Sequence, residues 1–301
     1  MPLVFLRIST LTPVDFAASF IFDEKNISSS TATTLERLTS AIYSTPFEKV
    51  SIYQSIPIHK ENSIMKNGNI KTIFFDAADT LFYIERGLGN TYASVAKKYG
   101  GDPHPDHLRK AFSKAFKSAP PLAFGGVSDD ERKVLEKNYW RDIVENVYED
   151  IGMFKEFDAH FDELFEVFRS DAWAIFPETK DVLKTLKKNN YNLGIISNFD
   201  SRVYDVMKNL EIHEYFETFV ISSEAGYAKP DPNIFHLALK EMNADPNECL
   251  HIGDHIHNDF HGARALGIKA LLLDREDEYE SIGDQHRIST LKEIHKFLDN
   301  S

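Results

Sequence analysis

Short apolar runs recur along the chain from residue 71 onward, and several of them end in a polar residue. Five runs stand out, at residues 71–76, 192–197, 218–222, 250–254 and 269–273. Their apolar positions are continuous rather than alternating, which is typical of strands that are buried on both faces. The runs therefore predict the strands of a parallel sheet.

Helical periodicity separates these predicted strands. Apolar side chains recur every three or four positions over residues 178–188 and 203–210. The sequence Pro230-Asp231-Pro232 predicts the start of a further helix, with Asp231 as its N-cap. Strands that alternate with helices indicate an α/β fold with right-handed crossovers and helices on both faces of the sheet. In such sheets, ligands bind beyond the carboxyl ends of the strands.

One long segment interrupts this alternation. Residues 84–172 show only helical stripes, and Ser128 with Glu131 matches a capping box ahead of one of them. We interpret this segment as a helical-bundle cap that is inserted after the first strand. The sheet domain would then consist of residues 65–83 and 173–301.

The first 64 residues lack comparable patterns. Arg7 and Asp15 interrupt the apolar start, and residues 23–64 are rich in Ser and Thr and mix charges. Neither a signal peptide nor a transit peptide is therefore favoured. We hypothesise that residues 1–64 are a disordered or dispensable extension and that the functional polypeptide begins at Met65.

Composition narrows the class of protein. The 301 residues are 42% hydrophobic and 27% charged, which fits about two folded units with a sizeable core. A net charge of -13 disfavours nucleic acid and acidic membranes as partners. The single cysteine, Cys249, favours a reducing compartment, and no apolar run approaches the roughly 20 residues that span a bilayer. We therefore expect a cytoplasmic protein with a small-molecule substrate, and the sequence leaves any protein partner unknown.

Reactive side chains stand at or just after the predicted strand ends: Asp76, Ser197, Lys229 and Asp254, with Asp259 close behind. Because the carboxyl ends of parallel strands meet at one edge, we expect these groups to share a site. A carboxylate such as Asp76 can attack phosphorus or carbon and form a covalent intermediate. Attack on a phosphate requires positive charge, which Mg²⁺ and Lys229 can supply. Mg²⁺ prefers carboxylate ligands, which suits Asp76 and Asp254.

These residues lie in four ordered motifs that resemble those of the haloacid dehalogenase superfamily of hydrolases. The motifs are Asp76-Ala-Ala-Asp-Thr80-Leu, Ile195-Ile-Ser197-Asn198, Ala228-Lys229-Pro-Asp-Pro, and Gly253-Asp254 with Asn258-Asp259. One such motif alone is a weak signal, but four in order with strand context are specific. The sequence is most similar to the branch named haloacid dehalogenase-like hydrolase domain-containing protein three.

The resemblance implies a Rossmann-like core and assigns roles to the motif residues. Asp76 would be the nucleophile, and Asp76, the backbone carbonyl of Ala78 and Asp254 would surround Mg²⁺. Ser197 and Lys229 would bind the phosphate group.

Three further motif residues are candidates for the same site. We add Thr80 and Asn198 as candidate substrate contacts. Asp259 has three interpretations: a metal ligand, a partner that orients Lys229, or the N-cap of a following helix.

One departure from the superfamily concerns Ala78. Phosphatases of this superfamily usually carry an acid/base Asp two residues after the nucleophile, and Asp79 follows one position too late. Successive side chains of an extended chain face opposite sides, so Asp79 should point away unless the chain turns sharply there. General acid catalysis contributes about 10²–10⁴ in rate. We therefore expect weak activity on alkyl phosphates and better activity on aryl or acyl phosphates.

Other interpretations remain open for each residue. Asp76 could cap a loop, Lys229 could be a solvated loop lysine, Asp254 an ordinary turn residue, and the Ser197 hydroxyl could only satisfy backbone groups. The ordered strand context favours the functional interpretation. The histidines His251, His255, His257 and His261 straddle a strand, a loop and a helix start, so a shared transition metal is not expected. The thiol of Cys249 is expected in the core.

Three other functions compete with phosphate hydrolysis. Haloacid dehalogenases also lack the second Asp, but they are metal-independent and do not need the Asp254 carboxylate. Phosphonate cleavage also places Ala at position 78 but needs a Schiff-base lysine from the cap, for which Lys110, Lys114 and Lys117 are the candidates. A catalytically idle binding protein of the same fold is the third alternative.

Overall fold

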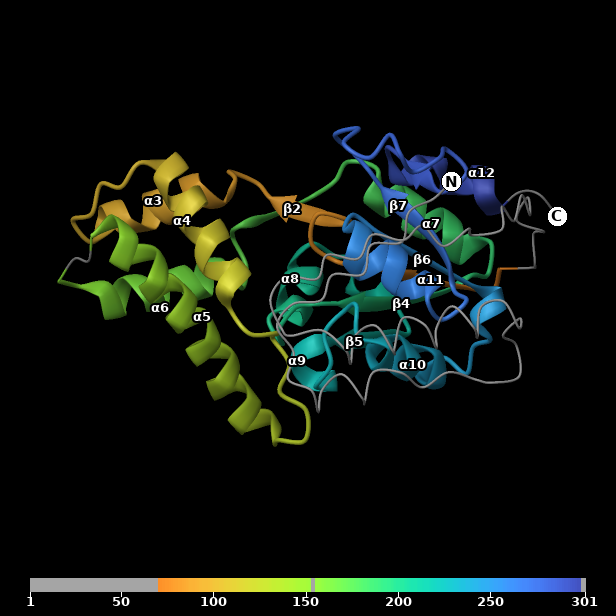
Figure 1. Ribbon diagram of the computed structural model, residues 1–301, viewed down its shortest axis with the longest axis horizontal. Coiled ribbons are helices and arrows are strands. Elements are labelled where there is room, and N and C mark those ends of the chain that lie inside the picture. Colours follow the sequence, from red (N-terminus) through yellow and green to blue (C-terminus); the bar gives the residue numbers. More distant parts are fainter. Residues whose placement is uncertain (1–69, 153–154, 299–301) are drawn as a thin grey trace, which may run out of the picture. The chain divides into compact units, whose positions relative to one another are not determined.

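The computed structural model describes residues 70–152 and 155–298 (Figure 1). The hypotheses about residues 1–64 and about a start at Met65 lie outside the described residues. In the described part of the chain, no helix has the length and apolar character that crossing a membrane requires.

A six-stranded parallel sheet forms the centre, with the strand order β5-β4-β1-β6-β7-β8. The strands are β1 Thr72–Phe75, β4 Asn192–Ser197, β5 Thr218–Ile221, β6 Cys249–Gly253, β7 Lys269–Leu273 and β8 Arg287–Ile288. The first five coincide with the five apolar runs, so the predicted parallel α/β sheet is confirmed. The sixth strand was not predicted, because two residues are too few to give a periodic signal.

Helices cover both faces of this sheet. They are α7 Thr179–Lys188, α8 Val203–Asn209, α9 Ser222–Ala225, α10 Pro232–Glu241, α11 Gly262–Arg264 and α12 His295–Leu298. Phe75 of β1 packs in a cluster with side chains of α7 and α8, whereas Phe74 packs with side chains of α10 and α11. Both faces of β1 are therefore buried, which explains its continuous apolar sequence. Asp231 caps α10 as predicted, because its side chain accepts a hydrogen bond from the Asn233 N–H.

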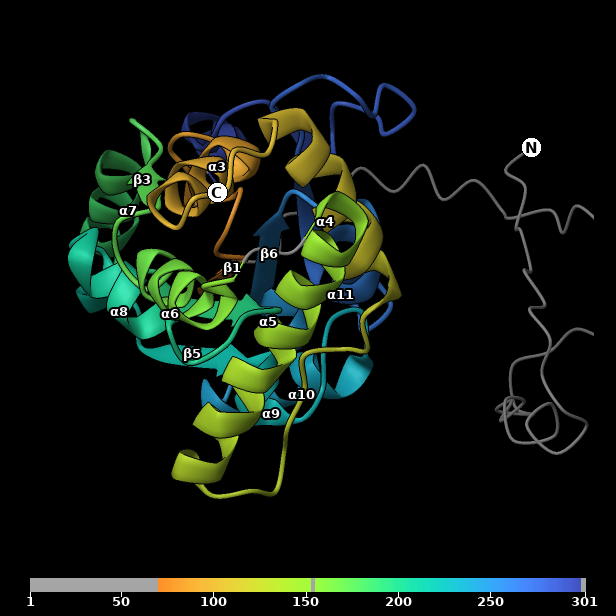
Figure 2. The same cartoon turned by 90° about the vertical axis from the view of Figure 1, so that its left-hand side faces the viewer.

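Four helices occupy the segment in which the sequence predicts a cap, and we call them the cap helices. They are α3 Leu88–Lys98, α4 Pro105–Ser118, α5 Asp129–Ile151 and α6 Phe157–Val167. Figure 2 shows them in front of the strands. Ser128 caps α5 by accepting a hydrogen bond from the Glu131 N–H, and aromatic side chains such as Tyr92 and Phe161 fill the core between these helices.

Two short antiparallel strands, β2 Phe82–Ile84 and β3 Trp173–Ile175, join the cap helices to the sheet. Sequence patterns did not indicate them, because three residues cannot establish a period. Phe82 and Trp173 meet edge to face, with ring centroids 5.2 Å apart. The two connections are therefore packed together rather than independent.

Arg275, which follows β7, contacts both of these connections. Its guanidinium donates to the Thr80 carbonyl at 3.0 Å and to the Glu178 carboxylate at 2.7 Å. It also lies 3.5 Å from the ring centroid of Phe176. One side chain thus fixes the segment after β1 and the segment after β3 to the edge of the sheet.

Gly194 in β4 provides a test of this packing. A Cβ atom there would lie 2.8 Å from the Phe74 ring and 2.9 Å from the Thr218 side chain. We expect Gly194→Ala to lower the free energy of unfolding by about 1–3 kcal/mol, the usual cost of overpacking a core. Urea denaturation measures this change, and Asn192→Ala at the exposed start of the same strand is the control. Equal stability of the two variants would contradict the packing of β4 against β1.

Candidate active site

Two neighbouring strands at the centre of the sheet deliver the first two carboxylates. Asp76 directly follows β1 and Asp254 directly follows β6, and the backbone N–H of Asp76 donates to the Ile252 carbonyl at 2.9 Å. Since β1 and β6 are paired in parallel, their ends place both side chains at the same edge. The expected convergence of these strand ends is therefore present.

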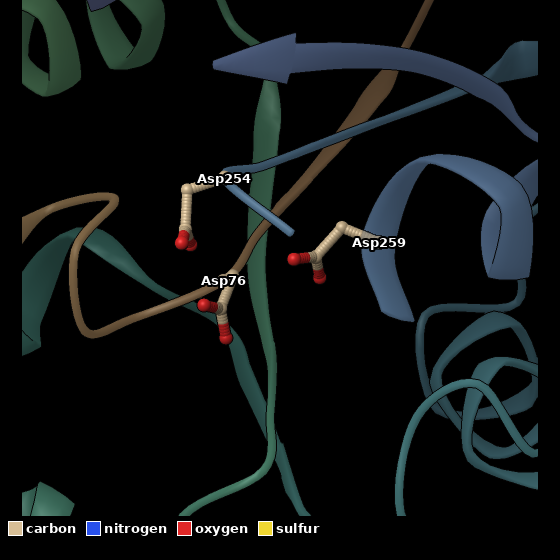
Figure 3. Close-up of side chains that lie close together, drawn as sticks. All are labelled: Asp76, Asp254 and Asp259. Atoms are coloured by element: carbon tan, nitrogen blue, oxygen red, sulfur yellow. The ribbon is translucent and has the colours of Figure 1, made fainter. Parts of the chain in front are cut away.

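Asp259 completes a cluster of three carboxylates. Oxygen atoms of Asp76, Asp254 and Asp259 all lie within 4.8 Å of one another. Figure 3 shows the three side chains gathered beyond the ends of the strands. Oxygen ligands at this spacing suit a hard divalent cation such as Mg²⁺. The three residues therefore fit the cation that the sequence motifs imply.

Lys229 supplies the positive charge beside this cluster. Its Nζ donates to Asp76 Oδ1 at 2.7 Å and to Asp259 Oδ1 at 2.6 Å, and the residue is only 4% exposed. Burial alone would lower the pKa of Lys229, but the two carboxylates outweigh burial and raise it. The ammonium group is therefore held in its charged form between Asp76 and Asp259.

Asp259 is buried and surrounded by donors. Besides Lys229, its carboxylate contacts His251 Nε2 at 2.9 Å and accepts from the His255 N–H at 3.1 Å. Burial would raise the pKa of Asp259, but Lys229 and His251 lower it well below its usual range. The helix N-cap interpretation of Asp259 is wrong, because the side chain of His255 caps the segment Ile256–His261.

Because Gly253 has no side chain, the carboxylate of Asp259 has room beside the end of β6. A Cβ atom on Gly253 would lie 2.3 Å from the Asp259 carboxyl carbon. Only a residue without a side chain therefore fits at the end of β6 while Asp259 faces Lys229.

The remaining predicted site residues lie around this centre. Ser197 is buried at the end of β4, beside β1. Asn198 exchanges two hydrogen bonds with the backbone of Lys229, donating to its carbonyl at 2.9 Å and accepting from its N–H at 2.7 Å. Thr80 donates from its hydroxyl to Asp254 Oδ1 at 3.2 Å. Asn198 and Thr80 therefore orient Lys229 and Asp254, whatever contact they make with a substrate.

The backbone turns sharply after the nucleophile candidate. Asp79 has a left-handed φ of 59°, and its N–H donates to the Phe82 carbonyl at 2.7 Å. Because the chain turns sharply at Asp79, the expectation that its side chain points away from the site does not apply. Asp79 is exposed as a whole, yet packing around its carboxyl group and then the charge of Asp76 raise its pKa, while Arg275 opposes the shift. The side chain of Ala78 carries no proton donor.

The pKa of Asp254 is raised by its surroundings in the site. Burial, followed by the negative charges of Asp76, Asp259 and Asp79, raises the pKa of Asp254 to about 8. Lys229 alone therefore does not compensate the carboxylates gathered here. A bound cation would remove this imbalance.

Some contacts of the site escaped the sequence analysis. His251 interrupts the apolar run of β6, and this interruption was the available signal for a buried partner of Asp259. The contact of Arg275 with Thr80 had no signal, because 195 residues separate them. The exposed rings of His255, His257 and His261 lie 5.7–6.5 Å apart between neighbouring centroids. In residues 70–152 and 155–298, the three aspartates are the only group of three or more such side chains with converging ligand atoms.

Comparisons with known proteins agree with these motifs. A family model described as a haloacid dehalogenase-like hydrolase matches residues 70–267. Haloacid dehalogenase-like hydrolase domain-containing protein 3 of Bos taurus is 27% identical over 243 residues, covering 76% of this chain and 94% of that protein.

Solved structures show the same fold in proteins of two activities. A HAD phosphatase from Thermococcus onnurineus has a TM-score of 0.54 at 22% identity, over 76% of this chain and 98% of that chain. A 2-haloacid dehalogenase from Pseudomonas syringae has a TM-score of 0.54 at 24% identity, over 76% of this chain and 98% of that chain. At these identities the two structures are evidence for the fold alone.

The raised pKa of Asp254 predicts a pH-dependent stability in chelator. The folded chain holds this proton up to about pH 8, whereas the unfolded chain releases it near pH 4, so the carboxyl group destabilises the fold increasingly as pH rises between these values. We expect Asp254→Asn to raise the free energy of unfolding by about 1–3 kcal/mol at pH 8 and by less at pH 5. Urea unfolding in EDTA measures the difference, with the exposed Asp171→Asn as control. A gain that shrinks as pH rises would contradict the charge imbalance.

Proposed function

Because the chain belongs to the haloacid dehalogenase-like hydrolase family, as its four motifs predict, we propose that it is a Mg²⁺-dependent hydrolase of a phosphorylated small molecule. One observation carries this proposal. Three carboxylates lie within 4.8 Å of one another, and one of them, Asp76, is bonded to a buried lysine. Such a cluster favours a bound cation, and it suits a dianionic phosphate that arrives together with Mg²⁺.

The reaction would proceed through Asp76. Its carboxylate oxygen forms a bond to phosphorus while the bond from phosphorus to the leaving-group oxygen breaks, which gives an aspartyl phosphate. Water then attacks phosphorus, the bond between phosphorus and the Asp76 oxygen breaks, and inorganic phosphate leaves while the Asp76 carboxylate is restored. Lys229 neutralises charge on the phosphoryl oxygens, and the Ser197 hydroxyl donates to one of them. Bound Mg²⁺, held by Asp76, Asp254 and the Ala78 carbonyl, would supply further positive charge to the same oxygens.

Asp259 contributes to this chemistry indirectly, through its contact with Lys229. Both of its oxygens already accept hydrogen bonds from Lys229, His251 and the His255 N–H. We therefore infer that its main role is to hold Lys229 in place, with metal ligation through Asp259 secondary to that of Asp76 and Asp254.

The competing functions fit the site less well. Carbon–halogen hydrolysis does not need a carboxylate at Asp254, whose pKa is raised by burial and by the neighbouring carboxylates. Phosphonate cleavage requires a desolvated lysine, and the candidates Lys110, Lys114 and Lys117 are exposed on α4. A non-catalytic binding role would not require the buried pairing of Lys229 with Asp76.

The surroundings of the reaction complete the proposal. We infer that residues 84–172 act as a cap over a small-molecule substrate. The net charge of -13 argues against nucleic acid as a partner, and the lone cysteine supports a cytoplasmic location. Cys249 is buried, and burial raises the pKa of its thiol to about 12, so it is a core residue without a catalytic role.

A metal-dependence screen tests the proposed reaction. Wild-type protein should hydrolyse p-nitrophenyl phosphate with Mg²⁺, and this turnover should vanish with EDTA. Asp76→Asn should lower turnover by roughly 10³-fold or more, because the substituted amide is a poor nucleophile. Asp171→Asn is the matched control outside the site. Halide release from haloacids that is insensitive to EDTA would favour dehalogenation instead, and inertness toward phosphates, phosphonates and haloacids would favour the binding role.

Ala78 predicts a dependence on the leaving group. Without a proton donor at this position, aryl and acyl phosphates should turn over faster than alkyl phosphates, because their leaving groups need no protonation. Ala78→Asp should raise alkyl phosphate turnover by about 10²-fold or more. Ala78→Asn, which has the same size but no acid, should not raise it. Equal rates on aryl and alkyl phosphates in the wild type would refute the missing-acid interpretation.

A further inference from the structure

The loop from Asn198 to Arg202 connects the candidate active site to the cap helices. It begins directly after Ser197, and at its start Asn198 holds the backbone of Lys229 through two hydrogen bonds. At its end, Asp200 and Arg202 are buried. This loop therefore touches the phosphate-binding candidates on one side and the cap helices on the other.

Asp200 is the centre of the contact with the cap. It is fully buried, and its two oxygens accept hydrogen bonds from Arg202 Nε at 2.9 Å and Nη2 at 2.7 Å. The indole N–H of Trp140 on α5 donates to the same carboxylate at 2.5 Å. A cap side chain thus supplies one of the donors that a buried carboxylate of the sheet domain requires.

Arg202 extends the contact to a second cap helix. Its guanidinium donates to the Phe165 carbonyl at 3.1 Å and lies 4.0 Å from the Phe165 ring centroid. The Trp140 ring centroid is 5.3 Å from the same guanidinium. The cation is therefore enclosed by aromatic surfaces of α5 and α6, a favourable position for an arginine.

A second acidic side chain contributes from the cap itself. Glu136, one turn before Trp140 on α5, is only 2% exposed. Its carboxylate accepts hydrogen bonds from the Ser201 N–H at 3.1 Å and from the Ser201 hydroxyl. Three consecutive residues, 200–202, are thus hydrogen-bonded to the cap helices, and only Phe199 separates them from Ser197 and Asn198.

We propose that Trp140 is a positioning residue. Through Asp200 it fixes the loop from Asn198 to Arg202, and this loop in turn holds Ser197, at the end of β4, in the arrangement that binds phosphate. This inference rests on the proposed function. A contact that served only to attach the cap would not need to engage this loop rather than the connections at β2 and β3. Because Asn198 also orients Lys229, the contact reaches both side chains that would hold the phosphoryl group.

Removal of the indole N–H tests the role of Trp140. Trp140→Phe keeps an aromatic ring beside Arg202 but leaves Asp200 without its donor from the cap. We expect the KM for p-nitrophenyl phosphate and the inhibition constant of inorganic phosphate, both measured with Mg²⁺, to rise about tenfold, as the loss of a hydrogen bond to a charged group implies. A smaller folded fraction would lower the apparent kcat and leave both constants unchanged, so the constants separate positioning from stability.

Tyr99→Phe is the matched control. It also removes a hydrogen bond from an aromatic side chain to a carboxylate, since the Tyr99 hydroxyl donates to Glu163 at 2.7 Å, but this bond lies within the cap helices. The control should leave KM and the phosphate inhibition constant unchanged. Wild-type constants in Trp140→Phe, or equal changes in both variants, would overturn the proposal.

Hydrogen–deuterium exchange tests the same contact without turnover. In Trp140→Phe, amides in residues 198–202 and 226–229 should exchange faster than in the wild type, while the sheet strands remain protected. Faster exchange throughout the variant, or exchange at the same rate as in the wild type in these segments, would contradict the positioning role. If the wild type neither turns over the aryl phosphate nor binds inorganic phosphate, the proposed function fails, and exchange still decides whether Trp140 orders the loop.

Discussion

The ion pairs of Lys229 hold the candidate site together. A single ammonium group lies between Asp76 and Asp259, with each oxygen within 2.7 Å. Lys229 and Asp259 are buried, and Asp76 is partly exposed. Removing one partner from a buried arrangement of this kind leaves an uncompensated charge, which costs about 3–5 kcal/mol. The ammonium group of Lys229 thus constrains the positions of three segments that are distant in the sequence. The same arrangement leaves Asp254 without an equivalent partner, which is why the site can accept another positive charge.

Much of the fold was predictable because buried parallel strands have an unambiguous sequence. Five continuous apolar runs gave five strands, and the carboxylates at their ends met at one edge as the topology requires. The meeting of Asp76 and Asp254 followed from the parallel direction of β1 and β6, whereas the place of Lys229 in the same site was expected from the sequence motifs. Pattern and topology act together for Asp76, Ser197 and Asp254, which stand at strand ends. Lys229 lies instead in the loop after α9, and Asp259 lies in the segment Ile256–His261.

Other parts of the site were not predictable, because they depend on pairs of side chains without a periodic signal. The contact between Trp140 and Asp200 spans 60 residues, and nothing in either neighbourhood marks the partner. His251 occupies a strand position that pattern reasoning assigns to the core, yet it supports Asp259 there. The short strands β2 and β3 and the two-residue β8 fall below the length at which alternation can be recognised. What the sequence conceals is thus the set of contacts between distant side chains, together with the shortest strands.

Arg275 has a consequence for how the cap helices can move. It holds the Thr80 carbonyl and the Glu178 carboxylate at once, so both connections to the cap are fastened on the sheet side of β2 and β3. If the cap helices rotated relative to the sheet, the pivot would lie beyond Thr80, in the paired strands β2 and β3. The segment between Asp76 and Thr80 stays with the sheet during such a swing. Asp76 would therefore keep its position relative to the sheet in any such rotation.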